Sequence, residues 1–524
     1  MTDHASALVA AAARSTVSGL FVQRARLYPQ RIAVEDGERR FSYAELERRS
    51  ARLAGVLAAR GVGTGDRVAI LSENRIEYLE TFLAAARIGA IVACQNWRLA
   101  RPELAHCLAL VQPKLVLASA RHAGALDGIA ERAAQAAPGA LELPAPVVFG
   151  PGYEALLAGA AAHDEVAALD PEAPLLILYT SGTTGLPKGA VLSHRAEIVR
   201  NLVTRAEFGV QPLDTFAAWS PLYHMGGAEN SLGTLMCGGK VIVVDGFDQT
   251  RLAQVVADEP LGWLLLMPGM VGPFADVLEA RAASACSVRV CGVMADLVPP
   301  ADIARITRLL DAPYANTFGA TETGCPPCSS SLIPIGEVPQ RLSKVQSPFC
   351  EVRLVDPEDR DVADGSPGEL AMRGPTLFSG YWQAEQTNRA DFRGGWFHMG
   401  DVFVRNPDGT LDFVDRVKYL IKSGGENVYP AEIERVMFGD PRVRDVAVVR
   451  RADARWGEVP VAFVARHDDS LDAETLRALC RAGLAGYKQP KGIAFIGYDE
   501  FPRSASGKIQ RHELEKRLDA TRFD

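Results

Sequence analysis

Residues 175–189 read LLILYTSGTTGLPKG, and this stretch decides the fold. An apolar run of strand length, Leu175–Leu178, leads directly into a loop with three glycines, four Ser or Thr hydroxyls and one lysine. Glycines let backbone N–H groups converge on an anion, hydroxyls add donors, and Lys188 neutralises charge. The spacing is not that of a P-loop, because Gly189 stands where that motif needs Ser or Thr. A Ser/Thr/Gly-rich surface loop would not explain the placed lysine, so the stretch predicts a phosphate-binding loop at the end of a buried strand.

The chain on either side of this loop alternates helical and strand patterns. Residues 40–110 and 175–320 repeat amphipathic helices and short apolar strands, which is typical of doubly wound α/β structure. From residue 345 short strands separated by turn residues predict a β-rich subdomain. After Arg416 a unit of two helices and three strands follows, with a pattern that could fold separately. We predict two domains: a large N-terminal domain of two doubly wound α/β subdomains plus the β-rich subdomain, residues 1–415, and a small α+β C-terminal domain, residues 416–524.

Composition narrows the class of protein. A chain of 524 residues is too long for a single hydrophobic core, so more than one domain is expected. Its content of 48% hydrophobic and 23% charged residues is ordinary for a soluble enzyme. No apolar run approaches the roughly 18 residues of a membrane span, and the N-terminus lacks the basic segment of a signal peptide. Nine scattered cysteines favour reduced thiols and a cytoplasmic location. The net charge of −8 argues against nucleic acid as a partner.

Five ordered motifs resemble those of the adenylate-forming superfamily, which includes acyl-CoA synthetases, luciferases and the adenylation domains of peptide synthetases. Tyr179–Gly189 resembles its signature loop, and Phe318–Glu322 (FGATE) resembles its Tyr-Gly-x-Thr-Glu segment. Gly395–Asp401 (GWFHMGD) resembles its Gly-Trp-x-x-Thr-Gly-Asp segment. Asp415–Glu434 resembles the hinge region, and Pro502–Lys508 (PRSASGK) resembles the C-terminal lysine motif. The likeness covers nearly the whole chain.

The resemblance implies an ATP-dependent acid–thiol ligase that uses Mg²⁺ and coenzyme A. A carboxylate attacks the α-phosphate of MgATP and gives an acyl adenylate and pyrophosphate. The mobile C-terminal domain, with its hinge near Lys418, then rotates, and the thiol of coenzyme A displaces AMP. The implied partners are a small carboxylic acid, ATP and CoA, with no integral membrane contact. Homodimers are common in the family, so the resemblance adds a second copy of the chain to the partners that can be expected.

The resemblance also assigns the phosphate chemistry to named residues. Thr321 donates to the α-phosphate, Glu322 is a hard oxygen ligand for Mg²⁺, and Lys508 stabilises charge at the α-phosphate and the substrate carboxylate. The β- and γ-phosphates are implied to be held by Thr180, Ser181, Gly182, Thr183, Thr184 and Lys188.

Further roles concern the nucleoside, the CoA arm and the acyl group. Phe318 stacks on adenine beside Gly319, while Asp401 accepts the ribose hydroxyls and Arg416 adds a donor. The backbone of Gly424 and Gly425 lies beside the pantetheine arm, because glycine allows a thin ligand close to the main chain. His224 has an orienting or charge-stabilising part in the thioester step.

Some positions depart from the family pattern around the acyl pocket. Val293 and Met294 replace very small residues and reshape the pocket wall, and residues 341–348 (RLSKVQSP) lack the usual pair of glycines. The residues expected to line the pocket are mostly small or apolar. We therefore expect an aryl or medium-chain aliphatic acid rather than a dicarboxylate, which would need a placed arginine.

Two other functions are compatible with parts of the sequence, and a Cys-x-x-Cys motif also needs an interpretation. The chain could be an adenylating enzyme that loads a carrier protein, or a nucleotide-binding module without catalysis. The retained Glu322 and Lys508 argue against the second. Cys325 and Cys328 form a Cys-x-x-Cys, but no second pair stands nearby to complete a zinc site. We expect these cysteines to shape the acyl pocket rather than to act in redox or metal chemistry.

Overall fold

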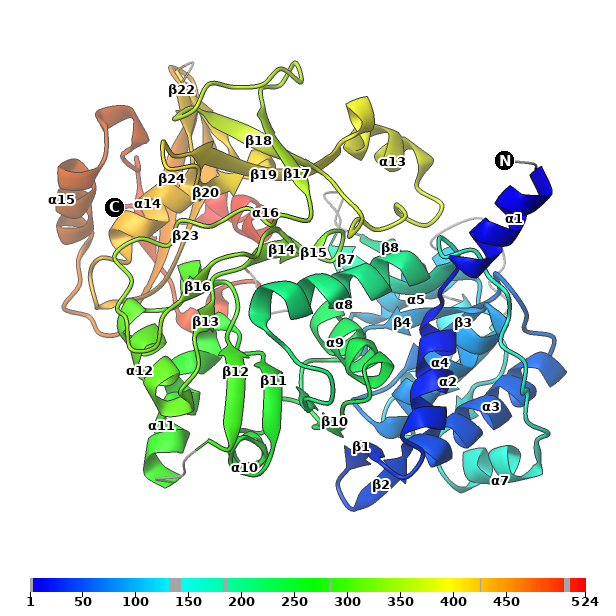
Figure 1. Ribbon diagram of the computed structural model, residues 1–524. Coiled ribbons are helices and arrows are strands. Elements are labelled where there is room, and N and C mark those ends of the chain that lie inside the picture. The colour runs from blue at the N-terminus through cyan, green and yellow to red at the C-terminus, as the bar shows by residue number, and fades with distance from the viewer. Residues whose placement is uncertain (1–2, 132–142, 182–185, 282–284, 425, 504–508) are drawn as a thin grey trace. The chain divides into compact units, whose positions relative to one another are not determined.

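In the computed structural model of this protein, residues 3–131, 143–181, 186–281, 285–424, 426–503 and 509–524 are described (Figure 1). They divide into two units. Unit 1 comprises residues 1–351 and 373–392, and unit 2 comprises residues 352–372 and 393–524. The β-rich stretch before Arg416 thus groups with the C-terminal module. The boundary between the units does not show where the chain rotates, so a hinge near Lys418 stays a prediction.

The first sheet of unit 1 has six strands in the order β6-β5-β3-β4-β7-β8. All neighbours are parallel except the last pair, β7 and β8, which run antiparallel. The strands are β3 (Arg67–Leu71), β4 (Ile91–Gln95), β5 (Leu115–Ala118), β6 (Val147–Val148), β7 (Pro174–Ser181) and β8 (Pro187–Ser193). The side chains of Leu175–Leu178 are buried, as expected for a strand inside a sheet covered on both faces.

Two further sheets in unit 1 complete the doubly wound region. One has the order β2-β1-β10-β9 and the other β11-β12-β13-β16. Their strands are β1 (Ile32–Asp36), β2 (Arg39–Ser42), β9 (Phe216–Ala218), β10 (Val241–Val243), β11 (Pro260–Leu264), β12 (Ser287–Cys291), β13 (Tyr314–Ala315) and β16 (Leu332–Ile333). A separate two-stranded ribbon, β14 (Phe318–Ala320) and β15 (Gly324–Cys328), follows β13 along the chain.

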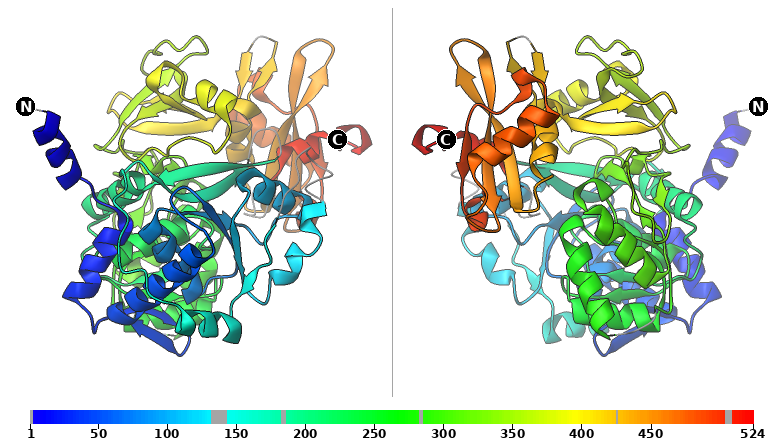
Figure 2. Two further views of the ribbon diagram at one scale, coloured as in Figure 1. Left: turned by 90° about the vertical axis from the view of Figure 1, so that its right-hand side faces the viewer. Right: turned by 90° about the vertical axis from the view of Figure 1, so that its left-hand side faces the viewer.

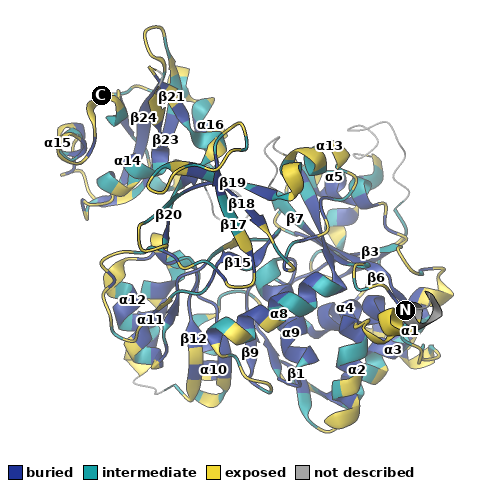
Figure 3. Cartoon of the chain, turned by 45° about the horizontal axis from the view of Figure 1, so that its top comes forward, coloured by how far each residue is buried: buried dark blue, intermediate teal, exposed yellow. Residues whose placement is uncertain are grey.

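Helices pack on these sheets, and the sheets form the dark, buried layers of Figure 3. The α-helices with described bounds in unit 1 are α1 (Asp3–Ala12), α2 (Val17–Leu27), α3 (Tyr43–Ala59), α4 (Ile76–Ile88), α5 (Arg101–Val111), α7 (Pro151–Gly159), α8 (His194–Phe208), α9 (Met225–Met236), α10 (Gln249–Asp258), α11 (Val271–Arg281), α12 (Pro300–Leu310) and α13 (Glu385–Asp391). The helix α1 projects from the rest of unit 1 (Figure 2). None of the described helices combines the length and the apolar character that a membrane span needs.

Local sequence explains why α8 begins and ends where it does. Ser193, the last residue of β8, caps the helix by accepting a hydrogen bond from Ala196 N at 3.2 Å. Gly209 ends it in the left-handed conformation, with φ of 67°. The chain therefore runs from the phosphate loop through β8 directly into α8, which lies beside α9 (Figure 1).

Unit 2 contains two sheets. The first has the order β17-β18-β19-β20 and the second β22-β21-β24-β23, with β25 pairing to β24. Their strands are β17 (Glu351–Val355), β18 (Pro367–Arg373), β19 (Phe397–Arg405), β20 (Leu411–Arg416), β21 (Ile421–Ser423), β22 (Glu426–Val428), β23 (Val443–Asp453), β24 (Gly457–Arg466) and β25 (Ile493–Phe495). The α-helices are α14 (Pro430–Met437), α15 (Ala473–Gly483) and α16 (Arg511–Glu515).

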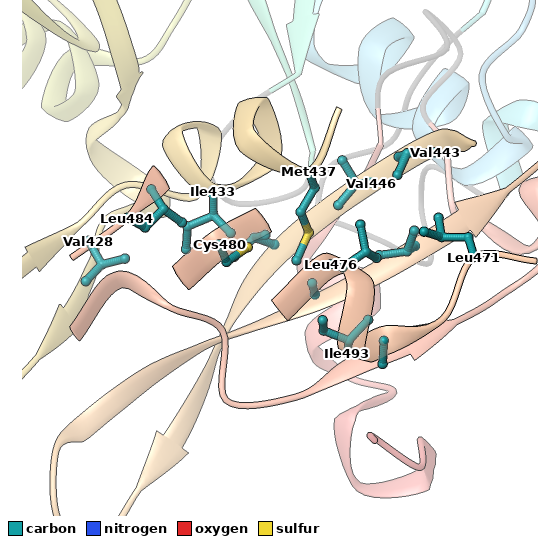
Figure 4. Close-up of a cluster of buried hydrophobic side chains, with 14 of the residues drawn as sticks. Val428, Ile433, Met437, Val443, Val446, Leu471, Leu476, Cys480, Leu484 and Ile493 are labelled. Carbon is teal, nitrogen blue, oxygen red and sulfur yellow. The ribbon is translucent and has the colours of Figure 1, made fainter. Parts of the chain in front are cut away.

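Apolar residues of α14 and α15 form a core with one face of the second sheet (Figure 4). Ile433 and Met437 come from α14, Leu476 and Cys480 from α15, and all are buried. The opposite face is covered by a second cluster that includes Leu514 of α16. This α+β module and the α/β sheets of unit 1 confirm the predicted fold class.

Candidate active site

The predicted phosphate loop joins two antiparallel strands of unit 1. Thr180 in β7 lies opposite Lys188 in β8, so the two side chains leave the sheet on the same face at the base of the loop. The backbone of Ser181 ends β7. Of the predicted phosphate ligands, Gly182, Thr183 and Thr184 lie outside the described residues.

Lys188 is held by an aromatic ring and a carboxylate. Its Nζ lies 4.3 Å from the centroid of the Tyr381 ring and 3.9 Å from Asp391 Oδ2. Its side chain is 21% exposed, so the ammonium keeps access to a ligand. A partly desolvated cation over an aromatic face is suited to a phosphate group.

The Thr321–Glu322 pair lies in the turn that connects β14 and β15. The turn is closed by the Thr323 hydroxyl, which accepts from Ala320 N at 2.9 Å. Glu322 is fixed at two points: its carbonyl accepts from Phe378 N at 2.9 Å, and its Oε1 accepts from the Tyr381 hydroxyl at 2.8 Å. The carboxylate is therefore oriented within unit 1.

Tyr381 is a site residue that the sequence reasoning missed. Its ring contacts Lys188 and its hydroxyl binds Glu322, so one side chain touches both the predicted phosphate cation and the predicted metal ligand. Gly380 before it has φ of 91°, and its carbonyl accepts from Val191 N in β8 at 3.0 Å. A Gly-Tyr pair was the only signal in the sequence, and it is too common to indicate a site.

The carboxylate of Glu322 fits a magnesium ion that also binds phosphate. Within the described ranges no group of three or more His, Cys, Asp or Glu side chains could form a metal cage. Mg²⁺ is commonly bound through one or two carboxylates with substrate phosphates and water. A single oriented carboxylate that contacts the same tyrosine as the predicted phosphate-binding lysine matches that donor set.

The predicted nucleoside and acyl residues of unit 1 occupy ordered positions. Phe318 and Gly319 form the start of β14, where Phe318 pairs with Cys328. A Cβ on Gly319 would lie 2.0 Å from the carbonyl oxygen of Gly324, so only glycine fits there. His224 caps α9 through its carbonyl, which accepts from Gly227 N and Ala228 N, and its ring lies 4.6 Å from that of Tyr223.

The Cys-x-x-Cys lies in strand β15, and within the described residues neither cysteine is part of a disulfide. Burial raises the pKa of the Cys325 thiol to about 12, which keeps it protonated and unreactive at neutral pH. Cys328 is fully buried. A packing role fits both side chains.

The unusual segment at residues 341–348 contains a buried lysine. Lys344 Nζ is 2.6 Å from Asn316 Oδ1 and 2.7 Å from Asp296 Oδ2, and its side chain is not exposed. Met294 nearby in sequence adopts φ of 48°, and the Val293 carbonyl accepts from the Tyr314 hydroxyl at 3.0 Å. The buried Lys344 therefore lies in the segment that lacks the pair of glycines usual in the adenylate-forming superfamily.

In unit 2, Asp401 and Arg416 are brought together. They are directly paired residues of β19 and β20, and Arg416 Nε lies 3.0 Å from Asp401 Oδ1. The Asp401 side chain is almost fully buried, whereas that of Arg416 is 42% exposed. Lys418 follows in a short 3₁₀ turn. Lys508 and Gly425 lie outside the described residues.

A cavity of about 230 Å³ lies beside Gly424 in unit 2. A Cβ on Gly424 would lie 2.7 Å from Trp456 Cε3, so the absence of a side chain admits the indole. The lining residues are Ser423, Gly424, Glu426, Trp456, Gly486, Tyr487 and Lys491. Trp456 and Tyr487 offer aromatic faces on which a flat ring can stack.

Comparison with known proteins places these features in context. The chain matches the AMP-binding enzyme family over residues 21–382 and the AMP-binding enzyme C-terminal domain over residues 432–508. It is 36% identical over 510 residues to a feruloyl-CoA synthase of Amycolatopsis sp., which covers 95% of this chain and 98% of that protein. It is 34% identical over 500 residues to an indoleacetate–CoA ligase of Aromatoleum aromaticum, covering 94% and 96%.

The chain is also similar in fold to solved structures of a CoA synthetase. An o-succinylbenzoate CoA synthetase of Bacillus subtilis, in complex with its acyl-adenylate intermediate, superposes with a TM-score of 0.81 at 26% identity and covers 95% of this chain and 97% of that one. The same enzyme in complex with ATP and a magnesium ion gives a TM-score of 0.78 at 26% identity, with 94% and 98% covered.

Proposed function

The chain belongs to the family of AMP-binding enzymes, and on that premise we propose that it joins an aromatic monocarboxylic acid to coenzyme A through an acyl adenylate. The observation that carries the chemistry is Tyr381, which holds Lys188 and Glu322 at one place in unit 1. A phosphate-binding cation and a magnesium-binding carboxylate are what the activation of a carboxylic acid by MgATP requires.

In the first half-reaction a carboxylate oxygen attacks the α-phosphorus of ATP. A new P–O bond forms, the bond to the β-phosphate breaks, and pyrophosphate leaves. Mg²⁺ bound to Glu322 would neutralise charge on the phosphates. Thr321 would donate its hydroxyl to the α-phosphate, and Lys508 would stabilise the charge that develops there. The β- and γ-phosphates would be bound by Thr180, Ser181, Gly182, Thr183, Thr184 and Lys188.

The remaining predicted residues would bind the nucleoside. Phe318, beside Gly319, would stack on adenine and Asp401 would accept hydrogen bonds from the ribose hydroxyls. The ion pair between Asp401 and Arg416 supports this assignment, because it orients the carboxylate.

In the second half-reaction the sulfur of coenzyme A attacks the acyl carbon. The bond between that carbon and the phosphate oxygen breaks, AMP leaves, and the thiol proton is lost to solvent or to a base. His224 would orient the acyl group or stabilise charge in this step. The backbone of Gly424 and Gly425 would lie along the pantetheine arm. The cavity beside Gly424 supports this use of the glycines, because it adds a site for an aromatic ring.

The substrate class is supported by a buried arginine of α8. Arg200 already binds Glu229, the Thr321 carbonyl and the Thr376 carbonyl. A second carboxylate on the substrate would meet a guanidinium whose Nε and Nη1 already donate, with its charge paired to Glu229, so that only the buried Nη2 is left without a hydrogen-bond partner among the described residues. The relatives named for ferulate and indoleacetate act on aromatic acids with one carboxylate, so we favour this class over medium-chain aliphatic acids. A homodimer and a cytoplasmic location are retained as predictions.

A panel of acids tests the proposal. Hydroxycinnamic, arylacetic, benzoic, C6–C10 aliphatic and dicarboxylic acids are compared by AMP release with and without coenzyme A. We expect the highest kcat/KM for an aromatic monocarboxylate and turnover that requires coenzyme A. Transfer to a carrier protein without coenzyme A would favour the carrier-loading alternative. ATP binding without turnover of any acid would favour the non-catalytic module.

Replacing Trp456 by alanine tests the proposed CoA site. Stacking on an aromatic side chain contributes about 1–3 kcal/mol per base, so we expect the KM for coenzyme A to rise roughly 10-fold or more. ATP–pyrophosphate exchange, which does not use coenzyme A, should stay at the wild-type rate. Phe438→Ala, which removes another exposed aromatic side chain of unit 2, is the matched control. An unchanged KM for coenzyme A in Trp456→Ala would remove this cavity from the proposal.

A further inference from the structure

A buried arginine in the middle of α8 binds the turn that carries the proposed catalytic pair. Arg200 Nη1 donates to the Thr321 carbonyl at 3.1 Å, and Nε donates to the Thr376 carbonyl at 2.7 Å. The side chain is only 3% exposed. One guanidinium therefore bridges two backbone segments that are far apart in sequence.

These two segments also meet on the other side of the turn. The segment that contains Thr376 continues to Phe378 and Tyr381, which hold the carbonyl and the carboxylate of Glu322. Thr321 is thus tied to this segment through Arg200, and Glu322 is tied to it directly. Loss of Arg200 would remove the link between this segment and Thr321 and leave the two hydrogen bonds to Glu322.

The turn also packs on the stem of the arginine. Gly324 has φ of 78°, and a Cβ there would lie 2.9–3.0 Å from Cδ, Cγ and Nε of Arg200. The backbone approaches the side chain so closely that the path of the turn depends on where Arg200 lies.

The position of Arg200 is set by Glu229 of α9. Arg200 Nη1 lies 2.5 Å from Glu229 Oε1, and both side chains are buried. A buried ion pair of this kind adds little stability compared with apolar residues of similar size, and its best-attested use is to specify geometry. Planar guanidinium groups suit this task, because their donors point in fixed directions.

A second carboxyl group lies near this pair. Glu197 of α8 is fully buried, and neither of its oxygens has a hydrogen-bond partner within the described part of the chain. Burial, followed by the negative charge of Glu229, raises the pKa of Glu197 well above its usual value. The raised pKa favours the neutral form of Glu197, so the ion pair of Arg200 is formed with Glu229.

We propose that Arg200, oriented by Glu229, is a positioning residue that sets Thr321 and Glu322 for MgATP. The inference rests on the proposed function for the identity of the ligand. It adds two residues, one on α8 and one on α9. Of these, Arg200 donates its hydrogen bond to a backbone atom of the turn, the Thr321 carbonyl. Displacements of about 1 Å in such a turn can reduce rates by about 100-fold.

The test compares Arg200→Met, Arg200→Lys and Glu229→Gln with Arg205→Met. Arg205 is on the same helix and also binds a backbone carbonyl, that of Val210, but it contacts neither Thr321 nor Thr376. Each variant is measured by ATP–pyrophosphate exchange over a range of acid and MgATP concentrations. Calorimetric titration with ATP, with and without Mg²⁺, and thermal unfolding are recorded in parallel.

We expect Arg200→Met to lower the kcat of adenylate formation about 10- to 100-fold with little change in KM for the acid. The gain in ATP affinity that Mg²⁺ gives the wild type should shrink in this variant. Arg200→Lys should recover part of both, because an ammonium can replace some of the contacts, and Glu229→Gln should lie between Arg200→Met and wild type. Arg205→Met should match wild type.

Two results would overturn the inference. The first is an Arg200→Met variant with wild-type kcat and wild-type Mg²⁺-dependent ATP affinity. The second is a fall in activity that only follows the loss of folded protein, with Arg200→Lys no better than Arg200→Met at equal folded fraction. If the wild type activates no acid, the proposed function fails, but the ATP titrations still decide the role of Arg200.

Discussion

Replacing Glu322 by glutamine is expected to lower the kcat of acyl-adenylate formation by about 100-fold or more. Glutamine keeps the size of the side chain, and its amide oxygen can still accept the Tyr381 hydroxyl, which lies 2.8 Å from Glu322 Oε1. The variant therefore removes the negative charge and leaves the shape. A neutral amide is a weak ligand for a hard divalent ion, so charge on the phosphates would be less well neutralised in the transition state.

The measurement is ATP–pyrophosphate exchange as a function of Mg²⁺ concentration. We expect the Mg²⁺ concentration for half-maximal rate to rise in Glu322→Gln along with the fall in kcat. Tyr381→Phe keeps the carboxylate and loses only its hydrogen bond, so a smaller loss, on the order of 10-fold, is expected. Glu337→Gln, an exposed glutamate of the same unit, serves as the control. A Glu322→Gln enzyme with wild-type kcat and Mg²⁺ dependence would show that another group binds the metal.

Local patterns predicted most of the fold, because the signals of strands and helix ends lie in consecutive residues. The apolar run before the phosphate loop is the core of β7, and the amphipathic stretch after Ser42 is α3, which that serine caps. In the C-terminal module the helices and strands predicted after Arg416 include α15 and β24. The predicted site residues Thr321, Glu322 and Asp401 likewise belong to motifs made of consecutive residues.

The missed features depend on pairs that are distant in the chain. Tyr381 meets Glu322 across 59 residues, and Arg200 meets the Thr376 carbonyl across 176. Neither member of such a pair carries a local pattern, because the contact exists only after β8, β14 and β15 have assembled. Lys344 and Asp296 are a third example. From the sequence alone nothing distinguishes Arg200, Lys344 and Asp296 from solvated charged residues, whereas the fold buries or orients their side chains.

The β-rich stretch shows a different limit. Its strands were predicted from turn residues and alternation, and they are present as β17–β20. The sequence assigned them to the N-terminal domain, while the structure groups most of them with the C-terminal module. Which sheet packs against which module depends on side-chain faces that are read only in three dimensions.

Replacing Lys508 by alanine is expected to lower the rate of acyl-adenylate formation by about 100- to 1,000-fold. This size is typical for the loss of one group that stabilises developing negative charge. Lys508 itself lies outside the described residues, but the described residues before and after it are paired with each other. Arg503 and Ile509 form an antiparallel bridge, and Gln510 N donates to the Pro502 carbonyl at 2.7 Å.

The same variant should retain the second half-reaction. Charge accumulates on the α-phosphate when the carboxylate attacks, whereas thioester formation only releases AMP from an acyl adenylate that already exists. Thioester formation from a supplied acyl adenylate and coenzyme A should therefore stay within about twofold of wild type. Lys516→Ala, which removes an exposed lysine of unit 2, is the control and should leave both half-reactions unchanged. If Lys508→Ala slowed both half-reactions equally, the lysine would serve substrate binding or folding, because a group that acts on the α-phosphate alone must separate the two steps.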